Sequence, residues 1–253
     1  MRRVRVIPVL TIDKGKLVKT INFKKPRYIG DPVNAVKIYN DKEVDEVVLL
    51  DITATKNRSE PNYAKIEEIC SEAFMPFAYG GGIHSIEQID VLFSLGIEKV
   101  ILNSCLSDNP SFVKKASSKY GAQSIVASID VRKNLLGKYR IHTHSGQLKI
   151  KHSIESYVSL VLNLGVGEII LTSINQEGTF KGFDNQLIQE VSNYSNVPVV
   201  ANGGAADLAS FKEAINYGAS AVAASSQFIY RGRTNGILIN YPSQEQLKST
   251  VFS

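Results

Sequence analysis

The sequence is poor in cysteine and lacks tryptophan: its 253 residues include only two cysteines, Cys70 and Cys105. Two cysteines are too few for the disulfide framework of a small secreted domain, and their spacing matches no metal-binding motif. The cytoplasm is therefore the expected compartment. Long apolar runs are missing as well, since none approaches the roughly 20 residues that a membrane-spanning helix requires. These absences favour a globular cytoplasmic protein without a membrane partner.

A strong excess of either charge is also missing, because 29 basic residues stand against 24 acidic ones and the formal net charge is +5. The basic residues look scattered along the chain, without the clustering and interleaved aromatics of a nucleic-acid footprint, so we expect no nucleic-acid partner. The four histidines show no ligand spacing, and we expect neither a metal site nor a cofactor. A small anionic ligand suits a mildly basic protein.

The chain contains two copies of one pattern. A shift of 122 residues lays residues 76–104 on residues 198–226 without a gap, and it also lays 46–53 on 168–175. A shift of 119 residues brings VIPVLTI at 6–12 onto IVASIDV at 125–131, so that Thr11 falls on Asp130. A repeat of this length indicates two matching structural units.

Each copy holds four apolar, β-rich runs, and the eight runs start near Val4, Glu46, Pro76, Lys99, Ser124, Glu168, Pro198 and Ala221. Helical spacing lies between them, most clearly at 64–74 and at 85–96, where Ser85 is the expected N-cap and Gly96 follows the helix. Strands alternating with helices in two equal halves predict a parallel (βα)8 TIM barrel. It would span 1–253 as one domain, with half-barrels of about 1–121 and 122–253. An open doubly wound sheet is the alternative, but it gives no reason for equal halves.

In such a barrel the active site lies at the C-terminal ends of the strands. Paired glycines between a strand and a helix let backbone N–H groups approach an anion at the helix N-terminus. These pairs recur in both halves, which favours two phosphate grips and a bisphosphate ligand over simple tight turns. The predicted phosphate-binding residues are Gly81, Gly82, Asn103, Ser104, Gly203, Gly204, Ala224 and Ser225.

Other strand ends carry polar side chains after apolar runs, namely Thr11, Asp51, Asp130 and Ser173. Asp130 is the stronger candidate for general acid or base chemistry. Asp51 is as readily a structural hydrogen-bond acceptor, so both interpretations stay open. The long connections at 12–33 and 131–152 are expected to be active-site loops.

Charged residues mark the opposite ends of four strands, because Arg5, Glu46, Lys99 and Glu168 each stand where a strand begins. We expect their side chains to converge as a ring of alternating charge on the barrel floor. The ring is either a salt-bridged lid that closes the core or a gate for a passage along the barrel axis.

Over essentially its whole length the sequence resembles the cyclase subunit of imidazole glycerol phosphate synthase. The motifs that carry the resemblance are GDPV at 30–33, DEVVLLDITATK at 45–56, GGGI at 80–83, IDV at 129–131, LTSINQEGTFKGFD at 171–184 and NGGA at 202–205. The resemblance implies a glutaminase subunit docked on the floor. It also implies that ammonia passes the gate formed by Arg5, Glu46, Lys99 and Glu168 and attacks a bisphosphate at the barrel mouth.

The sequence departs from the family pattern at central positions. The family relies on an aspartate after strand one and another after strand five; the second is Asp130, but the first is Thr11, whose hydroxyl cannot act as a carboxylate at neutral pH. The family's DRDGT turn is NQEGT here, so Asn175 and Glu177 differ as well. Asp13 lies on the same side of the strand two residues beyond Thr11 and is a candidate for partial substitution, against which stands that a displacement of several ångström is enough to spoil proton transfer.

The candidate catalytic residues are accordingly Asp130, Thr11, Asp13, Lys19 and Asp51. A retained gate with a lost aspartate points to a paralogue that conducts ammonia for a different product. Residues 18–56 are similar to the branch that works with an N-acetyl sugar amidotransferase in synthesis of surface polysaccharide such as lipopolysaccharide, and this branch is favoured. The authentic cyclase of histidine biosynthesis is the alternative, supported by the phosphate grips. The related ribonucleotide isomerase, which needs no gate, is a further one.

Overall fold

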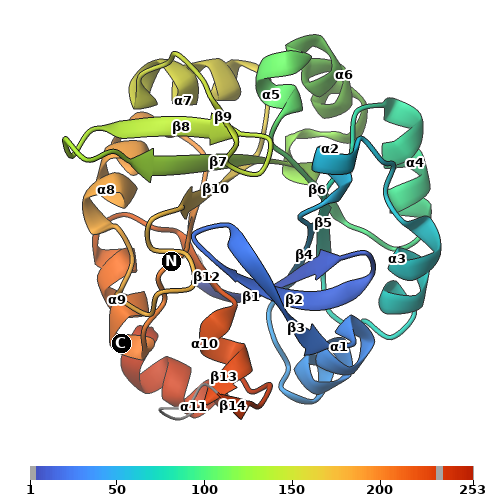
Figure 1. Ribbon diagram of the computed structural model, residues 1–253, viewed down its shortest axis with the longest axis vertical. Coiled ribbons are helices and arrows are strands. Elements are labelled where there is room, and N and C mark those ends of the chain that lie inside the picture. The colour runs from blue at the N-terminus through green and yellow to red at the C-terminus, as the bar shows by residue number, and fades with distance from the viewer. Residues whose placement is uncertain (1–3, 232–235, 253) are drawn as a thin grey trace.

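Eight parallel strands close into a barrel in the computed structural model, which describes residues 4–231 and 236–252 (Figure 1). Each strand pairs in parallel with the next, and the last pairs with the first, so the open sheet is excluded. The predicted (βα)8 barrel is confirmed. In order, the barrel strands are β1 (Arg5–Asp13), β4 (Val47–Asp51), β5 (Phe77–Gly80), β6 (Lys99–Leu102), β7 (Ile125–Lys133), β10 (Glu168–Ser173), β11 (Val199–Asn202) and β12 (Ala221–Ala224).

Helices surround the barrel and link its strands (Figure 1). The longer ones are α1 (Pro32–Asp41), α3 (Tyr63–Cys70), α4 (Ile86–Ser94), α6 (Pro110–Tyr120), α7 (Ile154–Asn163), α8 (Asn185–Tyr194) and α9 (Leu208–Asn216). Short helices are α2 (Ala54–Asn57), α5 (Cys105–Asp108), α10 (Ser226–Ile229) and α11 (Gln244–Gln246), the last followed by a π-helical turn at Leu247–Val251. A 3-10 turn at Ala122–Ser124 and the small strand pair β13 (Tyr230–Arg231) and β14 (Gly236–Ile237) complete the fold. None of the helices in the described part of the chain is long and apolar enough to cross a membrane.

Local sequence explains where α4 begins and ends, whereas a contact with α1 explains the end of α3. The Ser85 side chain caps α4 and forms a capping box with Gln88, and Gly96 follows the helix with φ +97°, as expected. The helix expected at 64–74 ends early, at Cys70. Asn40 binds the carbonyl of Glu72 and the N–H of Phe74, and it therefore holds the following residues in a non-helical path.

The two long connections expected as active-site loops are antiparallel hairpins that continue barrel strands. β2 (Lys16–Ile21) and β3 (Lys24–Gly30) extend β1, while β8 (Tyr139–Thr143) and β9 (Leu148–Lys149) extend β7. Because β1 and β7 hold matching places in the two halves, the hairpins also match. Both lie over the same end of the barrel (Figure 1).

Side-chain alternation along the strands separates two apolar clusters. One lies between the barrel wall and the helices. The other fills the lumen and consists of Ile7, Val9, Val48, Ala78, Ile101, Val126, Ile170, Val200, Ala221 and Ala223, with Leu50 packed against it. Because successive strand residues face opposite sides, every lumen residue is separated from the next on its strand by two positions. The lumen is therefore a narrow apolar column between the two ends of the barrel.

Candidate active site

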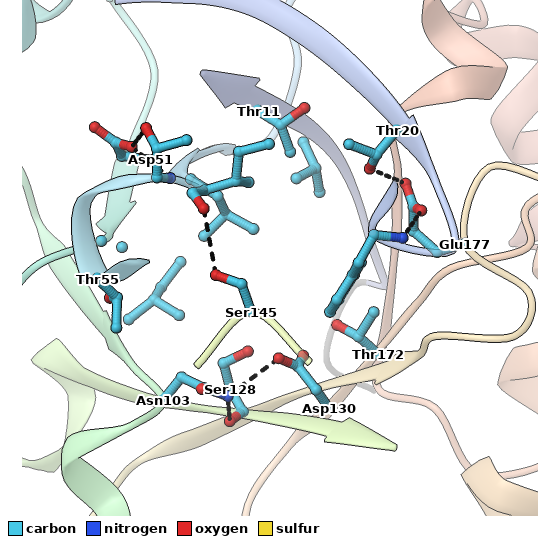
Figure 2. Close-up of a pocket in the computed structure, with 18 of the residues that line it drawn as sticks. Thr11, Thr20, Asp51, Thr55, Asn103, Ser128, Asp130, Ser145, Thr172 and Glu177 are labelled. Atoms are coloured by element: carbon cyan, nitrogen blue, oxygen red, sulfur yellow. Dashed lines mark hydrogen bonds between the residues drawn. The ribbon is translucent and has the colours of Figure 1, made fainter. Parts of the chain in front are cut away.

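A cavity of about 640 Å³ opens at the C-terminal ends of the strands. All eight barrel strands or the residues directly after them contribute to its wall, and so do both hairpins, through Lys19, Phe23, His144 and Ser145 among others. Figure 2 shows the polar side chains of several strands pointing into this space. A large cavity thus lies at the end of the barrel where the sequence predicted the candidate site.

Asp130 has the strongest perturbation of any acid in the cavity wall. Its carboxylate accepts a hydrogen bond from Asn103 Nδ2 at 3.2 Å and is only 7 % exposed (Figure 2). Burial raises the pKa of Asp130 to about 7, although hydrogen bonds from Thr172, Ser128 and Asn103 lower it in part. A carboxyl group that titrates near neutral pH is suited to give and take protons.

Thr11 occupies the matching place at the end of β1 but differs in its bonding. The hydroxyl donates to the carbonyl of Val18 in the neighbouring strand β2, and the residue is 8 % exposed. The single hydroxyl proton is therefore committed to the hairpin. The side chain lines the cavity without offering an acid or a base.

The two other aspartates predicted near this end, Asp51 and Asp13, differ in their hydrogen bonds. Asp51 Oδ1 accepts from the N–H groups of Thr53 and Ala54 at 2.9 Å and from the Thr53 hydroxyl, so its carboxylate organises the turn after β4. Asp13 lines the cavity, and its Oδ1 is buried without a hydrogen-bond partner among the described residues. Asp13 Oδ1 is thus a buried carboxylate oxygen that remains available to a ligand or a proton.

Lys19 is buried in the cavity wall, with 4 % of its surface exposed. Its ammonium donates to Ser225 Oγ, and Ser225 donates in turn to the carbonyl of Val9. Burial lowers the pKa of Lys19 to about 8, against the charge of Glu177, which raises it. At neutral pH this lysine is protonated, and it has no ion-pair partner in the described structure. Its ammonium group is therefore available to bind an anionic ligand.

The paired glycines are required by the fold whatever they bind. Gly81 has φ +136°, and a Cβ there would lie 2.8 Å from the Cβ of Asp51. Gly204 has φ +108°, and a Cβ would lie 2.1 Å from the carbonyl oxygen of Gly182. The short helices α5 and α10 that start beside these turns have no side-chain cap, so their first N–H groups are not satisfied by Ser104 or Ser225.

Glu177 fastens the first hairpin to the loop after β10. Its carboxylate accepts from the Thr20 hydroxyl at 2.9 Å and from the Phe23 N–H at 3.0 Å (Figure 2). Asn175 has a separate task, because its side-chain amide exchanges two hydrogen bonds with the backbone of Lys133 at the end of β7. Both side chains therefore join elements that frame the site.

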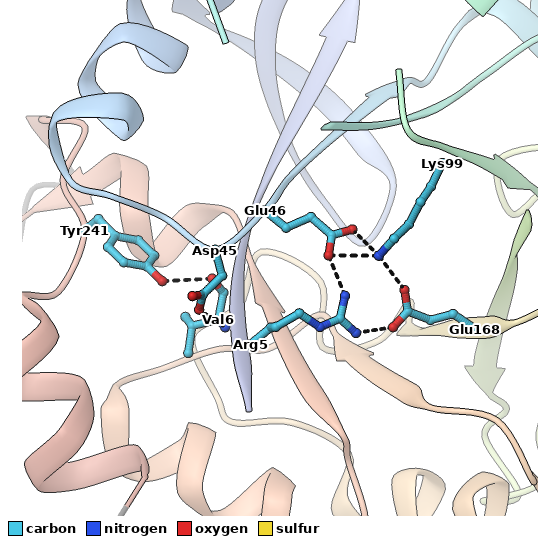
Figure 3. Close-up of polar contacts among 7 residues, drawn as sticks. All are labelled: Arg5, Val6, Asp45, Glu46, Lys99, Glu168 and Tyr241. Atoms are coloured by element: carbon cyan, nitrogen blue, oxygen red, sulfur yellow. Dashed lines mark hydrogen bonds and ion pairs between the residues drawn. The ribbon is translucent and has the colours of Figure 1, made fainter. Parts of the chain in front are cut away.

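Four charged side chains close the floor at the other end of the lumen. Arg5 pairs with both Glu46 and Glu168, and Lys99 Nζ lies 2.8 Å from Glu46 Oε1 and 3.2 Å from Glu168 Oε2 (Figure 3). Each base thus contacts both acids, and the four residues form the expected ring. The glutamates are buried and the bases are partly exposed on the outside of the floor.

Sequence reasoning missed two lumen-facing residues and misplaced a third. Thr172 and Asn202 line the cavity and are joined by a hydrogen bond of 3.1 Å, whereas Ser173, the expected residue, lies on the other side of β10. The signal was present, because Glu168 faces the lumen and side chains of a strand alternate. Counting in twos from Glu168 reaches Thr172 and passes over Ser173.

Comparison with known proteins gives one consistent result. A family model described as "Histidine biosynthesis protein" matches residues 5–235. A provisionally named imidazole glycerol phosphate synthase subunit of Pseudomonas aeruginosa is 43% identical over 98% of this chain and 99% of its own. A provisionally named HisF subunit of Leptospira borgpetersenii is 43% identical over 96% of each chain. The imidazole glycerol phosphate synthase subunit HisF of Endomicrobium trichonymphae is 39% identical over 92% of this chain and 90% of its own.

Proposed function

The chain belongs to the HisF family of imidazole glycerol phosphate synthase subunits, and on this premise we propose that it conducts ammonia from a glutaminase partner to another acceptor, without completing the family's cyclisation itself. The acceptor reaction is the amidation of an N-acetyl sugar by a separate amidotransferase, for a surface polysaccharide such as lipopolysaccharide. One contrast carries the proposal: the floor keeps a complete ring of charge, while the mouth holds Thr11 where an acid–base aspartate is needed.

The floor and the lumen suit the passage of neutral ammonia. The ring of Arg5, Glu46, Lys99 and Glu168 leaves each member in contact with its neighbours, so a side chain must move for a molecule to pass. Lys99 is the member suited to this movement, because a lysine has a flexible stem and a single point charge. Above the ring, the apolar lumen disfavours a charged ammonium ion and admits ammonia.

The mouth retains half of an acid–base pair. Asp130, with its pKa near 7, is able to carry a proton at neutral pH. Thr11 has its hydroxyl bound to Val18 and supplies no partner for that proton transfer. Lys19 lies in the same cavity as a buried cation and orients an anionic group of whatever ligand enters.

A second candidate is the authentic cyclase of histidine biosynthesis, and a specific observation favours it. The glycine turns remain beside uncapped short helices, and Lys56 and Arg58 line the cavity near the first of these turns. Such an arrangement suits a bisphosphate, which an ammonia conduit does not need. In this candidate Asp13, whose Oδ1 is buried and free of hydrogen bonds in the described structure, provides the missing carboxylate.

The experiment that separates the candidates is turnover of the phosphoribulosyl formimino carboxamide ribotide with excess ammonium salt, which bypasses the glutaminase. Wild type is compared with Thr11→Asp. We expect Thr11→Asp to be faster by about 10²–10⁴-fold, which is the usual contribution of one general acid or base. Wild-type turnover equal to that of Thr11→Asp would establish the cyclase and refute the proposal.

The passage through the floor has its own test. Lys99→Glu should uncouple glutamine hydrolysis by the glutaminase partner from use of the ammonia, because it breaks a ring in which Lys99 contacts both Glu46 and Glu168. Lys114→Glu, an exposed reversal on α6, is the matched control for the change in net charge. Unchanged coupling in Lys99→Glu would contradict the passage.

A further inference from the structure

The basic residues are not scattered, as the sequence suggested, but concentrated in two segments. Residues 14–30 and 131–151, which we call the mouth hairpins, each contain six lysines or arginines. They contain no acidic residue, so the mouth hairpins carry a formal charge of +12 and the rest of the chain −7. The modest net charge of +5 conceals this division.

The fold brings these two segments to one place. Both hairpins extend strands past the same end of the barrel, and both line the cavity (Figure 1). They approach each other at Phe23, whose ring lies 3.1 Å from the place of a Cβ on Gly146. Of the twelve basic residues, Lys19 alone is buried, and the other eleven are exposed or partly exposed. The opening of the cavity is therefore surrounded by positive charge.

The charge is not neutralised within the protein. Apart from the long-range influence of Glu177 on Lys19, the described structure contains no ion pair between a mouth-hairpin base and an acid. Elsewhere on the surface such pairs do form, for example between Lys119 and Asp90 and between Lys65 and Glu68. Uncompensated charge of one sign raises the rate at which an oppositely charged partner associates.

The mouth hairpins also expose large apolar side chains. Leu135 is fully exposed and Leu136 is 82 % exposed, both at the turn between β7 and β8, and Ile21, Tyr28 and Leu148 are exposed as well. Five of the eleven large exposed apolar residues of the described chain thus lie on these hairpins. Apolar anchors surrounded by a charged, solvent-accessible rim are typical of protein interfaces. Four of these five exposed residues are aliphatic and only Tyr28 is aromatic, whereas a surface for single-stranded nucleic acid relies on several aromatic residues among the cations.

We propose that the mouth hairpins are a docking surface for an acidic protein, the enzyme that consumes the ammonia delivered at the mouth. This rests on the proposed function. The leucines at 135 and 136 enter an apolar pocket of the partner, and the surrounding lysines and arginines face its carboxylates. Docking at this end covers the opening of the cavity, so ammonia passes to the acceptor without release into water. The glutaminase uses the opposite end, and both partners bind at once.

The first experiment identifies the molecules that contact the mouth, the side and the floor of the barrel in cells that produce the chain naturally. A photo-crosslinking amino acid replaces Leu135 at the mouth, Val91 on the exposed side of α4, or Phe74 before β5 at the floor end, each of them exposed. We expect Leu135 to yield one discrete protein adduct with an acidic surface, Val91 to yield none, and Phe74 to yield a different protein. Only a lipid, only a nucleic acid or no adduct at Leu135 would overturn the proposal.

The second experiment measures binding of the captured protein, after purification, to variants of the full chain. Leu135→Ser with Leu136→Ser should weaken binding at least tenfold, as expected for central apolar anchors. Lys138→Glu with Lys149→Glu should weaken binding at least tenfold at low salt and less at high salt. Lys114→Glu with Lys115→Glu, the same charge change on α6, should leave affinity unchanged. Equal effects of both charge reversals would overturn the proposal.

Ammonium-fed turnover by these variants in the Thr11→Asp background, where turnover is expected to be fast, separates the surface from the cavity. None of the four altered mouth-hairpin residues lines the cavity, so this turnover and the melting temperature should match those of Thr11→Asp alone. A change in the KM for the bisphosphate with no change in protein binding would assign the charge to a small anion and overturn the proposal. The coupling of glutamine hydrolysis to use of the ammonia is measured separately, in Lys99→Glu. Failure of the docking surface would change the binding results alone, whereas failure of the proposed function would change the result of the Lys99→Glu test.

Discussion

Thr11 and Asp130 occupy matching places in the two halves of the barrel, at the ends of β1 and β7, and each is followed by an antiparallel hairpin. Asp130 is buried with its pKa raised to about 7, while the Thr11 hydroxyl donates a hydrogen bond to a backbone carbonyl of its own hairpin. The comparison shows that a repeat fixes where a side chain lies but not what it does. The fold accommodates threonine at this place because a hydrogen bond across the hairpin satisfies its hydroxyl.

The largest expected effect is on turnover, in a variant that has an aspartate at both matching positions, 11 and 130. In a Thr11→Asp background, adding Asp130→Asn should lower ammonium-fed turnover by about 10²–10⁴-fold, because one of two proton carriers is again removed. Asp51→Asn in the same background is the matched control, since that carboxylate serves the turn to Thr53 and Ala54. Initial rates over a pH series measure the effect. A fall of similar size in the Asp51 variant would show that the halves do not divide the chemistry as proposed.

A second difference concerns stability as a function of pH. The folded pKa of Asp130, about 7, exceeds its ordinary value of 3.8, so between these values the folded state holds a proton that the unfolded state has released. Stability then falls as pH rises, by roughly 1.4 kcal/mol per pH unit, and the loss is complete above pH 7. Asp130→Asn lacks this loss. Its free energy of unfolding should exceed that of wild type by up to about 4 kcal/mol at pH 8 and show no such gain at pH 4.

Denaturant titrations of both proteins at several pH values measure this effect. The same difference between wild type and Asp130→Asn at pH 4 and at pH 8 would mean that Asp130 is ionised throughout. Asp130 would then be unable to exchange protons at neutral pH. It would no longer differ from Thr11 in its suitability for acid–base chemistry.

Much of this arrangement could be predicted from the sequence, because each feature depends on local pattern. The internal repeat predicted the barrel. The charged residues at the first positions of four strands predicted the floor ring of Arg5, Glu46, Lys99 and Glu168. Alternation along a strand, counted from these lumen-facing residues, also assigns Thr11, Asn103 and Thr172 to the lumen. It passes over Asp51, whose side chain turns to its own backbone.

Other features depend on contacts between distant segments and could not be read from local pattern. The pKa of Asp130 follows from its burial and from hydrogen bonds with Asn103 and Thr172 of other strands. Glu177 likewise fastens the first hairpin from a distant segment, through Thr20 and Phe23. The concentration of charge required knowledge that residues 14–30 and 131–151 meet at one opening. The net charge of the whole chain hides this concentration, because the remainder of the chain is acidic.

A smaller effect is expected at Thr11 itself. Thr11→Val keeps the shape of the side chain and removes the donor to the Val18 carbonyl, which should cost about 1 kcal/mol of unfolding free energy. The loss should be equal at pH 5 and pH 8, unlike the change in Asp130→Asn, because no titrating group is involved. Thr11→Ser retains the hydroxyl and is the control. A pH-dependent loss in the valine variant would show that Thr11 supports the ionisation of a neighbour.

The smallest effect is expected at Asp13, the carboxylate nearest in sequence to Thr11. Its Oδ1 is buried in the cavity wall without a hydrogen-bond partner in the described structure, but it lies one strand repeat beyond Thr11, or about 7 Å along β1. Direct proton transfer over such a displacement is poor. Asp13→Asn should therefore lower the residual ammonium-fed turnover of wild type by only about two- to fivefold, and that of Thr11→Asp by less. A hundredfold loss confined to the wild-type background would show that Asp13 has taken over the lost role, and the two halves would then be chemically equivalent after all.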